Sequence, residues 1–576
     1  MRFSKIPVKR LLLFGIIIVC TAAFIAKAIV CQPLSLIDEA NMYATSYRFY
    51  LGDAVLVEDW SPQQLFGVAL LPFFYLFRAF SGSNEGLFLF MSLCFLALKL
   101  LILIYGLMKA SHIHLNKTSV CIGLFILYFF SCFNMDTLTY QNLPLLVGMF
   151  ILIGVLADNT SRFTYVLMGA AYAFAVLSMP YIVISYPFVL ILSVVKSVKK
   201  RKPDAKAAAF HLGILLVFIW FVYLVLSRSS VDEVRRNLPY ILHEPDHNMS
   251  GSGLSGMLIK VKLTCKELLK LCKPVTYLQT GIFILLGIVF VLKRKYLEFL
   301  RPIIPAALLG SVLYIVHTND DLWNMNMMFI PFMFAAVEAF FFIRDKRYLL
   351  YLTAACLYVL SVALGTSTGA LATSGAICVV AVVFVFFWRE DDRILQDSAE
   401  GRSNLAIGRN QKLSAVVSAA AFVGIAGVIL FLRMYLICFS LPLSSEDYEN
   451  KITVGPMKGM YANDWLYDSY IAIWNEVSCI DRTEEDILFC GTSSPMVFLD
   501  AEVNYGTMGV PFYYLDYDRL KTYWEMHPDK LPTIIYYSDY TDEDSESFVN
   551  DMIEEEFDCR REGDALIAVK KKNVDR

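Results

Sequence analysis

A group of carboxylates follows the first long apolar run of the sequence. Asp38 and Glu39 come soon after that run, and Asp53, Glu58 and Asp59 follow in the same loop. A carboxylate costs about 2.5–3.5 kcal/mol when it enters the bilayer core, so these acids are expected at the membrane surface. A carboxylate held there can take a proton from a hydroxyl group, which is the task of a general base. The alternative is a hydrated loop whose acids face water.

Basic side chains near these acids are candidates for binding a phosphate group. Arg48 lies in the same loop, and His317 follows a late apolar run. The pair Arg235 and Arg236 lies in a second large loop. Arginine suits this role because its planar guanidinium forms two parallel hydrogen bonds with a phosphate. For each of these residues, a solvated loop charge is an equally consistent alternative.

A metal-binding pattern occurs in the second large loop. His243-Glu244-Pro245-Asp246-His247 satisfies H-E-x-x-H, and Glu267 follows at the distance of a third zinc ligand. The pattern requires both histidines on one helical turn, and Pro245 would destabilise that turn by about 3 kcal/mol. We therefore predict no zinc site here. A loop that closes over substrate and an ordinary loop both remain open, and a zinc metalloprotease is a remote alternative.

The composition excludes soluble and disordered chains. Of the 576 residues, 57% are hydrophobic and only 18% are charged, against about 45–50% and 25% in ordinary soluble domains. The charge is also divided: residues 440–576 hold 29 acidic and 12 basic residues, whereas residues 1–439 hold 24 acidic and 38 basic ones. The basic residues form short clusters between apolar runs, so no nucleic-acid partner is expected. The 13 cysteines include no C-x-x-C pair, which argues against a zinc or disulfide framework.

Thirteen apolar runs are close to the length of a membrane-spanning helix, which needs about 20 residues. They predict a multi-pass α-helical membrane protein, with the bilayer as its first partner. The runs lie near 11–30, 86–108, 119–135, 138–157, 163–179, 181–195, 207–227, 276–292, 302–316, 327–343, 348–364, 372–388 and 413–433.

One further apolar segment, 65–80, decides the topology. If it does not span, 25 Lys and Arg residues fall on the side of the N-terminus, and the short loops on the other side hold none. If it spans, 21 of those 25 lie outside, against the positive-inside rule. We therefore predict that 65–80 lies along the outer surface. The N-terminus is then cytoplasmic and residues 440–576 are extracytoplasmic.

Two domains follow from these patterns. Residues 1–439 form the transmembrane domain, with outer loops at 31–85 and 228–275, and residues 440–576 form a small acidic α/β domain. In the second domain, buried strands are predicted at Asp486–Cys490, Thr533–Tyr537 and Ala565–Val569, and helices at 464–480, 516–526 and 545–556.

The first outer loop carries a pattern that resembles a known superfamily. The Asp-Glu pair is followed by a helix with Tyr43 and Arg48, a turn at Gly52-Asp53, and an apolar surface helix with Pro72. This order resembles the GT-C superfamily, multi-pass glycosyltransferases that use polyprenyl-phosphate-linked sugars, such as protein O-mannosyltransferases and lipid A aminoarabinose transferases. The element at 139–142, Thr-Tyr-Gln-Asn, is similar to a Ser-Tyr-Asn element in uncharacterised bacterial members. The resemblance covers residues 1 to about 345.

The resemblance implies an inverting glycosyltransferase in the bacterial cell membrane. It would transfer a sugar from a polyprenyl phosphate to an envelope polysaccharide, lipid or protein on the outer face, with Asp38 as the catalytic base. Many members place an Arg and a Tyr before a late Pro-rich span, whereas this chain has His317 to Asp321 and Pro331 there, without the Arg. No cofactor is expected, and Mg²⁺ is an unsupported alternative. The predicted substrate-binding residues are Glu39, Tyr43, Arg48, Asp53, Asp59, Asp136, Tyr140, Asn142, Arg235, Arg236, His243, His247, His317, Asp320 and Asp321.

The main alternative function is non-catalytic, a flippase or an assembly component for lipid-linked glycans. Helices broken around Pro180 and Pro187 would suit a transporter. Two charges inside predicted spans, Lys99 and Glu338, could form an ion pair, or Lys99 could reach the membrane surface. An enzyme needs Asp38 at a closed outer cavity, whereas a transporter needs polar residues along a path through the membrane.

Overall fold

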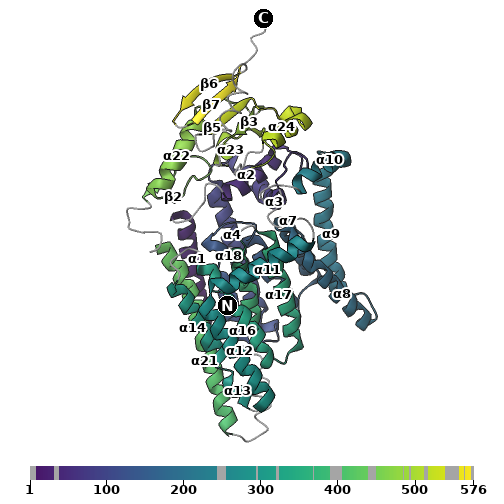
Figure 1. Cartoon of the computed structure of the whole chain (residues 1–576), viewed down its shortest axis with the longest axis vertical. Coiled ribbons are helices and arrows are strands. Elements are labelled where there is room, and N and C mark those ends of the chain that lie inside the picture. Colours follow the sequence, from purple (N-terminus) through teal and green to yellow (C-terminus); the bar gives the residue numbers. More distant parts are fainter. Residues whose placement is uncertain are drawn as a thin grey trace, which may run out of the picture.

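A bundle of long helices makes up most of the molecule, and a small sheet domain covers one end of it (Figure 1). The carboxyl terminus lies at the sheet end of the molecule. The computed structural model describes residues 8–30, 38–61, 63–242, 254–293, 296–318, 324–366, 369–388, 405–438, 449–483, 485–491, 495–510, 517–538, 557–563 and 565–571.

Every predicted apolar run coincides with a helix. Within the described residues, nine helical segments are long and apolar enough to cross a membrane, and five shorter apolar helices accompany them. The helices of the thirteen runs are α1 Val8–Val30, α4 Leu87–Lys109, α5 Lys117–Phe129, α6 Asn142–Leu156, α7 Arg162–Ser178, α8 Tyr186–Lys200, α9 Ala205–Leu226, α12 Lys273–Lys293, α14 Ile303–Thr318, α16 Ile330–Glu338, α17 Lys346–Gly365, α18 Ala370–Ala376 with α19 Cys378–Trp388, and α21 Leu405–Cys438.

The outer loops of the prediction are largely helical. The first contains α2 Asp38–Leu51 and α3 Gln64–Ser81, and the second contains α10 Val231–Leu242 and α11 Leu254–Leu271. Helix α3 is itself one of the nine segments long enough to span, so its position along the surface stays a prediction. It packs closely on α2, because Gly67 brings its backbone against Thr45. Two short helices complete the bundle, α13 Leu297–Leu300 and α15 Asn324–Met327.

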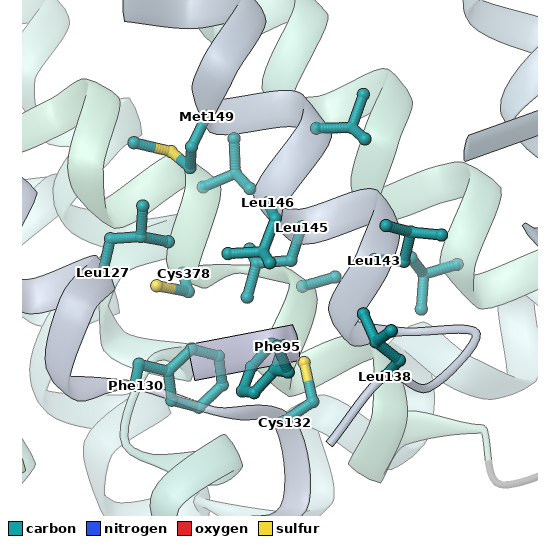
Figure 2. Close-up of a cluster of buried hydrophobic side chains, with 14 of the residues drawn as sticks. Phe95, Leu127, Phe130, Cys132, Leu138, Leu143, Leu145, Leu146, Met149 and Cys378 are labelled. Carbon is teal, nitrogen blue, oxygen red and sulfur yellow. The ribbon is translucent and has the colours of Figure 1, made fainter. Parts of the chain in front are cut away.

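The helices differ strongly in how many of their residues are buried. Of the residues in the spanning window of Ala370–Trp388, 94% are buried, whereas only 6% of those in the window of Pro180–Lys199 are buried. The first segment therefore lies at the centre of the bundle and α8 lies at its edge. Apolar side chains of α6, the segment before it and neighbouring helices fill the interior, and Cys132 and Cys378 pack among them as small apolar groups (Figure 2).

Helices α7 and α9 approach each other unusually closely. An added Cβ on Gly169 would lie 1.9 Å from the carbonyl oxygen of Phe210, and one on Gly213 would lie 2.0 Å from that of Val166. Only glycine allows two backbones to approach so closely, as in membrane helix pairs with small residues at the interface. The pair α7 and α9 therefore forms a rigid unit at one side of the bundle (Figure 1).

The C-terminal domain is an α/β module, as predicted. Its five-stranded sheet has the order β4-β3-β5-β7-β6, with β4, β3 and β5 parallel and β7 antiparallel to both β5 and β6. The three predicted strands are confirmed, and β4 and β6 were not predicted. The predicted helix at 545–556 lies outside the described residues. The elements are β1 Asn450–Lys451, β2 Tyr461–Ala462, α22 Asp464–Ser478, β3 Ile487–Cys490, α23 Met496–Ala501, β4 Asn504–Tyr505, α24 Tyr517–Met526, β5 Ile534–Ser538, β6 Phe557–Glu562 and β7 Ala565–Lys570.

Candidate functional site

Four charged side chains are fully buried where α1, α4 and α21 meet the segment that joins α5 to α6. We name Lys27, Lys99, Asp136 and Arg433 the membrane cluster. Arg433 binds Asp136 directly through its Nη2, and Lys27 Nζ lies 3.6 Å from Asp136 Oδ2. Lys99 joins them through Ser131, whose hydroxyl accepts from Lys99 Nζ at 3.0 Å and donates to Asp136 Oδ1 at 2.7 Å. One carboxylate therefore organises three cations.

Backbone carbonyls accept further hydrogen bonds from the membrane cluster. Lys99 Nζ donates to the carbonyl of Phe130 at 2.6 Å, and Lys27 Nζ donates to that of Asn134 at 2.8 Å. The guanidinium carbon of Arg433 also lies 3.9 Å from the centre of the Phe24 ring, a cation–π contact. These contacts make the burial of the charges tolerable, because an unsatisfied charge inside the membrane is very costly.

The segment that presents Asp136 has an unusual backbone held by amide side chains. Phe133 and Asn134 have positive φ angles of 56° and 60°, a conformation that costs energy for non-glycine residues. Asn142 holds the segment in place, since its Oδ1 accepts from Cys132 N at 2.9 Å and its Nδ2 donates to the carbonyl of Met135 at 2.9 Å. A strained backbone of this kind is typical of a functional site, because the surrounding structure must stabilise it.

Helix α2 connects the predicted acidic pair to this segment. Tyr43, one turn after Glu39, has its hydroxyl 2.5 Å from Thr137 Oγ1, next to Asp136. Glu39 is fully buried, and Asp38 is the first residue of α2. The structure describes the backbone of Asp38 and not its side chain. The N-terminal half of α2 therefore lies against the membrane cluster, and the acids of the first outer loop are not all in water.

The charges of the membrane cluster are unequal. Its named residues are three basic side chains and one acidic side chain. Burial alone would raise the pKa of the Asp136 carboxyl, but Arg433, Lys27 and Lys99 together hold that pKa below its usual range. Asp136 is therefore ionised, and the surroundings of the cluster favour further negative charge.

The other end of α2 lies in a second network, where the chain meets the C-terminal domain. We name Arg48, Asp53, Glu58, Asp59 and Lys530 the junction cluster. Arg48 binds Asp53 directly, and Lys530 Nζ lies 2.6 Å from Asp53 Oδ1 and 3.5 Å from Glu58 Oε1. Arg48 Nη1 lies 3.8 Å from Asp59 Oδ2. Arg48, Asp53 and Asp59, predicted to bind substrate, thus hold α2 to the C-terminal domain.

Aromatic side chains surround the junction cluster. Tyr523 of α24 accepts from Arg48 Nη2 at 3.0 Å and donates to the carbonyl of Glu58 at 2.9 Å. Trp60 stacks on Tyr240 of α10 with ring centres 4.3 Å apart, and its Nε1 donates to Asn237 Oδ1 at 2.8 Å. The junction therefore joins three parts of the chain: the first loop, α10 and the C-terminal domain.

Burial shifts the acid–base behaviour of the junction. It raises the pKa of Glu58, an effect that Asp53 increases and Lys530 opposes. It also raises the pKa of Asp59 against the pull of Arg48, and it lowers the pKa of His527, which lies beside Asn237. Each charged side chain of the junction cluster lies within 4 Å of one of opposite charge, as expected of groups that hold two parts of a protein together.

The remaining predicted site residues are distributed over the molecule. Tyr140 accepts from Gln141 Nε2 at 3.0 Å, next to Asn142 and the membrane cluster. Arg235 and Arg236 are exposed on α10, and His317 is exposed near the end of α14. Outside the described residues lie His243, His247, Asp320 and Asp321. Among the residues that are described, no group of three His, Cys, Asp or Glu side chains could hold a metal ion.

Two members of the membrane cluster were not predicted from the sequence. Lys27 lies near the end of the first apolar run, and Arg433 lies near the end of the last one. The signal available was a basic residue inside an apolar run, which is costly without a partner. That signal was recognised for Lys99, for which an ion pair with Glu338 or a position at the membrane surface was predicted. Both predictions are wrong, because the Lys99 ammonium donates to the carbonyl of Phe130 and to the hydroxyl of Ser131.

Two solved structures are similar to this chain in comparisons with known proteins. One is the archaeal oligosaccharyltransferase AglB from Archaeoglobus fulgidus in complex with an inhibitory peptide and a dolichol-phosphate, with 10% identity, 92% of this chain and 70% of that chain covered, and a TM-score of 0.39. The other is ArnT from Cupriavidus metallidurans in the apo state, with 13% identity, 96% and 98% covered, and a TM-score of 0.39. No family model matches the chain, and no curated protein matches it.

Proposed function

We propose that the protein is a membrane glycosyltransferase that moves a sugar from a polyprenyl phosphate to an acceptor in the cell envelope. The observation that carries the proposal is the contact between Tyr43 and Thr137, because it joins the acidic pair of α2 to the membrane cluster. A base for the acceptor and cations for a departing phosphate are the two groups that this reaction requires. The resemblance of the first outer loop to GT-C enzymes agrees with the proposal.

The reaction has one step in this proposal. Asp38 takes the proton of the acceptor hydroxyl, and the acceptor oxygen forms a bond to the anomeric carbon of the sugar. The bond between that carbon and the phosphate oxygen breaks, and its electron pair stays on the phosphate. Lys27 and Arg433 contact Asp136 directly, so they are the candidates for stabilising this charge. Attack opposite the leaving group inverts the configuration of the anomeric carbon.

The membrane cluster favours an enzyme over a flippase. A transporter needs polar groups along a path through the membrane. Here the side chains of Lys99, Asp136 and Arg433 are fixed by short hydrogen bonds, and apolar side chains surround them. Groups held in this way are suited to stabilising charge at one position.

The experiment is transfer of labelled sugar by purified protein with a panel of polyprenyl-phosphate sugars. Asp38→Asn keeps the size of the side chain and removes its charge, so we expect kcat to fall about 10²–10⁴-fold. Asp232→Asn, an exposed acid of α10, is the matched control and should keep full activity. An Asp38→Asn protein within threefold of the parent would exclude Asp38 as the base, and absence of transfer from every donor would count against the enzyme.

The proposal includes an orientation in the membrane. The acidic domain and the acidic pair face the outside, and the loops rich in Lys and Arg face the cytoplasm. Reporter fusions after Lys200 and after Asp500 should report opposite sides, with Lys200 inside. If both positions report the same side, the number of spans is wrong and the outer location of the site is lost with it.

A further inference from the structure

A long groove lies between α8 and the main bundle. It has a volume of about 540 Å³, and its walls are mostly apolar side chains of α6, α7, α8, α9 and α17. This volume is typical of sites that hold small molecules. Helix α8, which forms its outer wall, is the least enclosed of the spanning segments described, with 6% of Pro180–Lys199 buried. A helix so poorly packed leaves room for an occupant.

Two helical faces form the walls of the groove. On α8 the lining positions include Phe188, Leu192 and Lys196, and on α6 they include Gly148 and Leu152, both sets at the four-residue spacing of one helix face. The lining of α6 runs from position 144 to position 155, which is about 17 Å at 1.5 Å per residue. Half of the hydrocarbon core of a bilayer is about 15 Å thick. The groove therefore has the depth of one leaflet.

Two lysines and two aspartates line one end of the groove. Lys196 and Lys206 lie there, at the opposite end of α6 from Asn142. The two acids have other partners: Asp158 binds His114 at 2.5 Å, and Asp204 caps α9 through the backbone of Lys206. Lys206 Nζ donates to the carbonyl of Asp158 at 3.1 Å and lies 5.5 Å from the centre of the Tyr165 ring, and neither contact is with a carboxylate.

We propose that this groove binds one anionic phospholipid from the leaflet at the end that holds Lys196 and Lys206. An acyl chain would lie between α8 and α6, and the phosphate would lie between Lys196 and Lys206, since basic pockets between membrane helices recognise anionic headgroups. A phospholipid fits better than a polyprenyl carrier, whose chain is much longer than one leaflet. The site is separate from the proposed transferase centre, and its ligand is structural rather than a substrate.

Gly148 provides a direct test, because it lines the groove and an added Cβ there meets no atom within 4 Å. Gly148→Leu should fill the groove without disturbing the helix. Gly281→Leu is the matched control, since its Cβ also meets nothing within 4 Å and Gly281 does not line the groove. Native mass spectrometry of detergent-purified protein with added phosphatidylglycerol should show about tenfold less bound lipid for Gly148→Leu, and parental binding for Gly281→Leu.

A second pair of variants tests the headgroup. Lys196→Gln/Lys206→Gln should lower the preference for phosphatidylglycerol over phosphatidylcholine by about tenfold or more, whereas Lys199→Gln/Lys202→Gln, which do not line the groove, should keep it. Unchanged binding by Gly148→Leu would overturn the site. Equal binding of both phospholipids by the parent would overturn the anionic class. Binding of polyprenyl phosphate in preference to phosphatidylglycerol would overturn the choice of lipid.

Discussion

The membrane cluster and the junction cluster lie at opposite ends of the same short helix and differ in their charge. Asp38 and Arg48 are ten residues apart on α2, about 15 Å along its axis. Near the first end, three cations surround one carboxylate, whereas at the second end two cations meet three carboxylates. At the junction, each charged side chain has a partner of opposite sign within the chain, and such pairs serve to join parts of a protein. An excess of buried cations, as in the membrane cluster, favours the binding of a negatively charged group.

The largest expected effect tests the role of Asp136 as the centre of the membrane cluster. Asp136→Asn would leave three buried cations without their shared carboxylate, and breaking a buried pair in this way costs about 3–5 kcal/mol. We expect a strong loss of folded protein, measured as the yield of monodisperse material and its unfolding midpoint in detergent. Asp158→Asn, whose side chain is 71% exposed, is the control.

If Asp136→Asn is as stable as the parent, the three cations do not depend on this carboxylate. The contrast between the two clusters would then be lost, because the membrane cluster would not need its carboxylate for stability. Arg433→Lys gives a second measurement, since it keeps the charge and removes the second hydrogen bond of the guanidinium to the same segment. We expect it to be intermediate between the parent and Asp136→Asn.

A smaller effect is expected at the junction, because its acids have two cationic partners. Lys530→Met removes one of them and leaves Asp53 bound to Arg48, so we expect a loss of about 1–3 kcal/mol in the stability of the domain contact. Faster proteolysis of the C-terminal domain in the full-length protein would measure it. Transfer activity should fall as well, because α2 carries both the acidic pair and Arg48, which holds the helix at the junction.

Lys458→Met is the matched control for the junction. Lys458 also joins the C-terminal domain to the bundle, through Glu85 at 2.6 Å, but both side chains are more than 40% exposed. An exposed ion pair contributes about 0–1 kcal/mol, so this variant should resist proteolysis like the parent. Equal sensitivity of the two lysine variants would show that burial does not distinguish the junction from an ordinary surface contact.

The last effect depends on pH and concerns a buried acid that belongs to neither cluster. Asp500 of α23 accepts from the Tyr470 hydroxyl at 3.3 Å, and burial raises the pKa of its carboxyl well above the ordinary value of about 3.9. Because the folded protein favours the neutral acid, this group stabilises the domain fully below that ordinary value. The stability is lost as the pH rises through the raised pKa, by up to about 1.4 kcal/mol per pH unit.

Asp500→Asn should remove this part of the pH dependence, because the amide is neutral at every pH. The measurement is the unfolding midpoint of the C-terminal domain in the full-length protein at pH 5 and pH 8. We expect the variant to gain stability over the parent at pH 8 and little at pH 5. If the unfolding midpoints of the two proteins change equally between pH 5 and pH 8, the Asp500 carboxyl is ionised in the folded protein without a cost in stability.

Local sequence patterns predicted the helices and strands of this protein better than they predicted the contacts between them. Apolar runs marked the helices, and the alternation of strands and helices marked the C-terminal module. Strand β6 was missed because four of its six residues are charged, as is common in a strand at the edge of a sheet. The two residues of β4 are too few to give any pattern.

The candidate site was predicted only in part, for a physical reason. The acidic pair, Asp136 and Asn142 are visible as polar residues beside apolar runs, and the structure gathers Glu39, Asp136 and Asn142 in one region. Lys27 and Arg433 are stabilised in the interior by Asp136. In the sequence, Asp136 is more than a hundred residues from Lys27 and 297 residues from Arg433. No local pattern encodes such a partner. Arg48 and Asp53 were assigned to substrate for the same reason, since Lys530 is 477 residues from Asp53.

These separations impose an order on biosynthesis. The ribosome delivers Arg48 and Asp53 into the membrane early, but Tyr523 and Lys530 emerge only when the chain is nearly finished. Arg433, the partner of Asp136, is also among the last membrane residues to arrive. Until then α2 has its contacts with Thr137 and Asp53 but lacks those with the C-terminal domain. A chain that stops before the C-terminal domain therefore carries every residue of the proposed chemistry and lacks the anchor that this domain gives to its first outer helix.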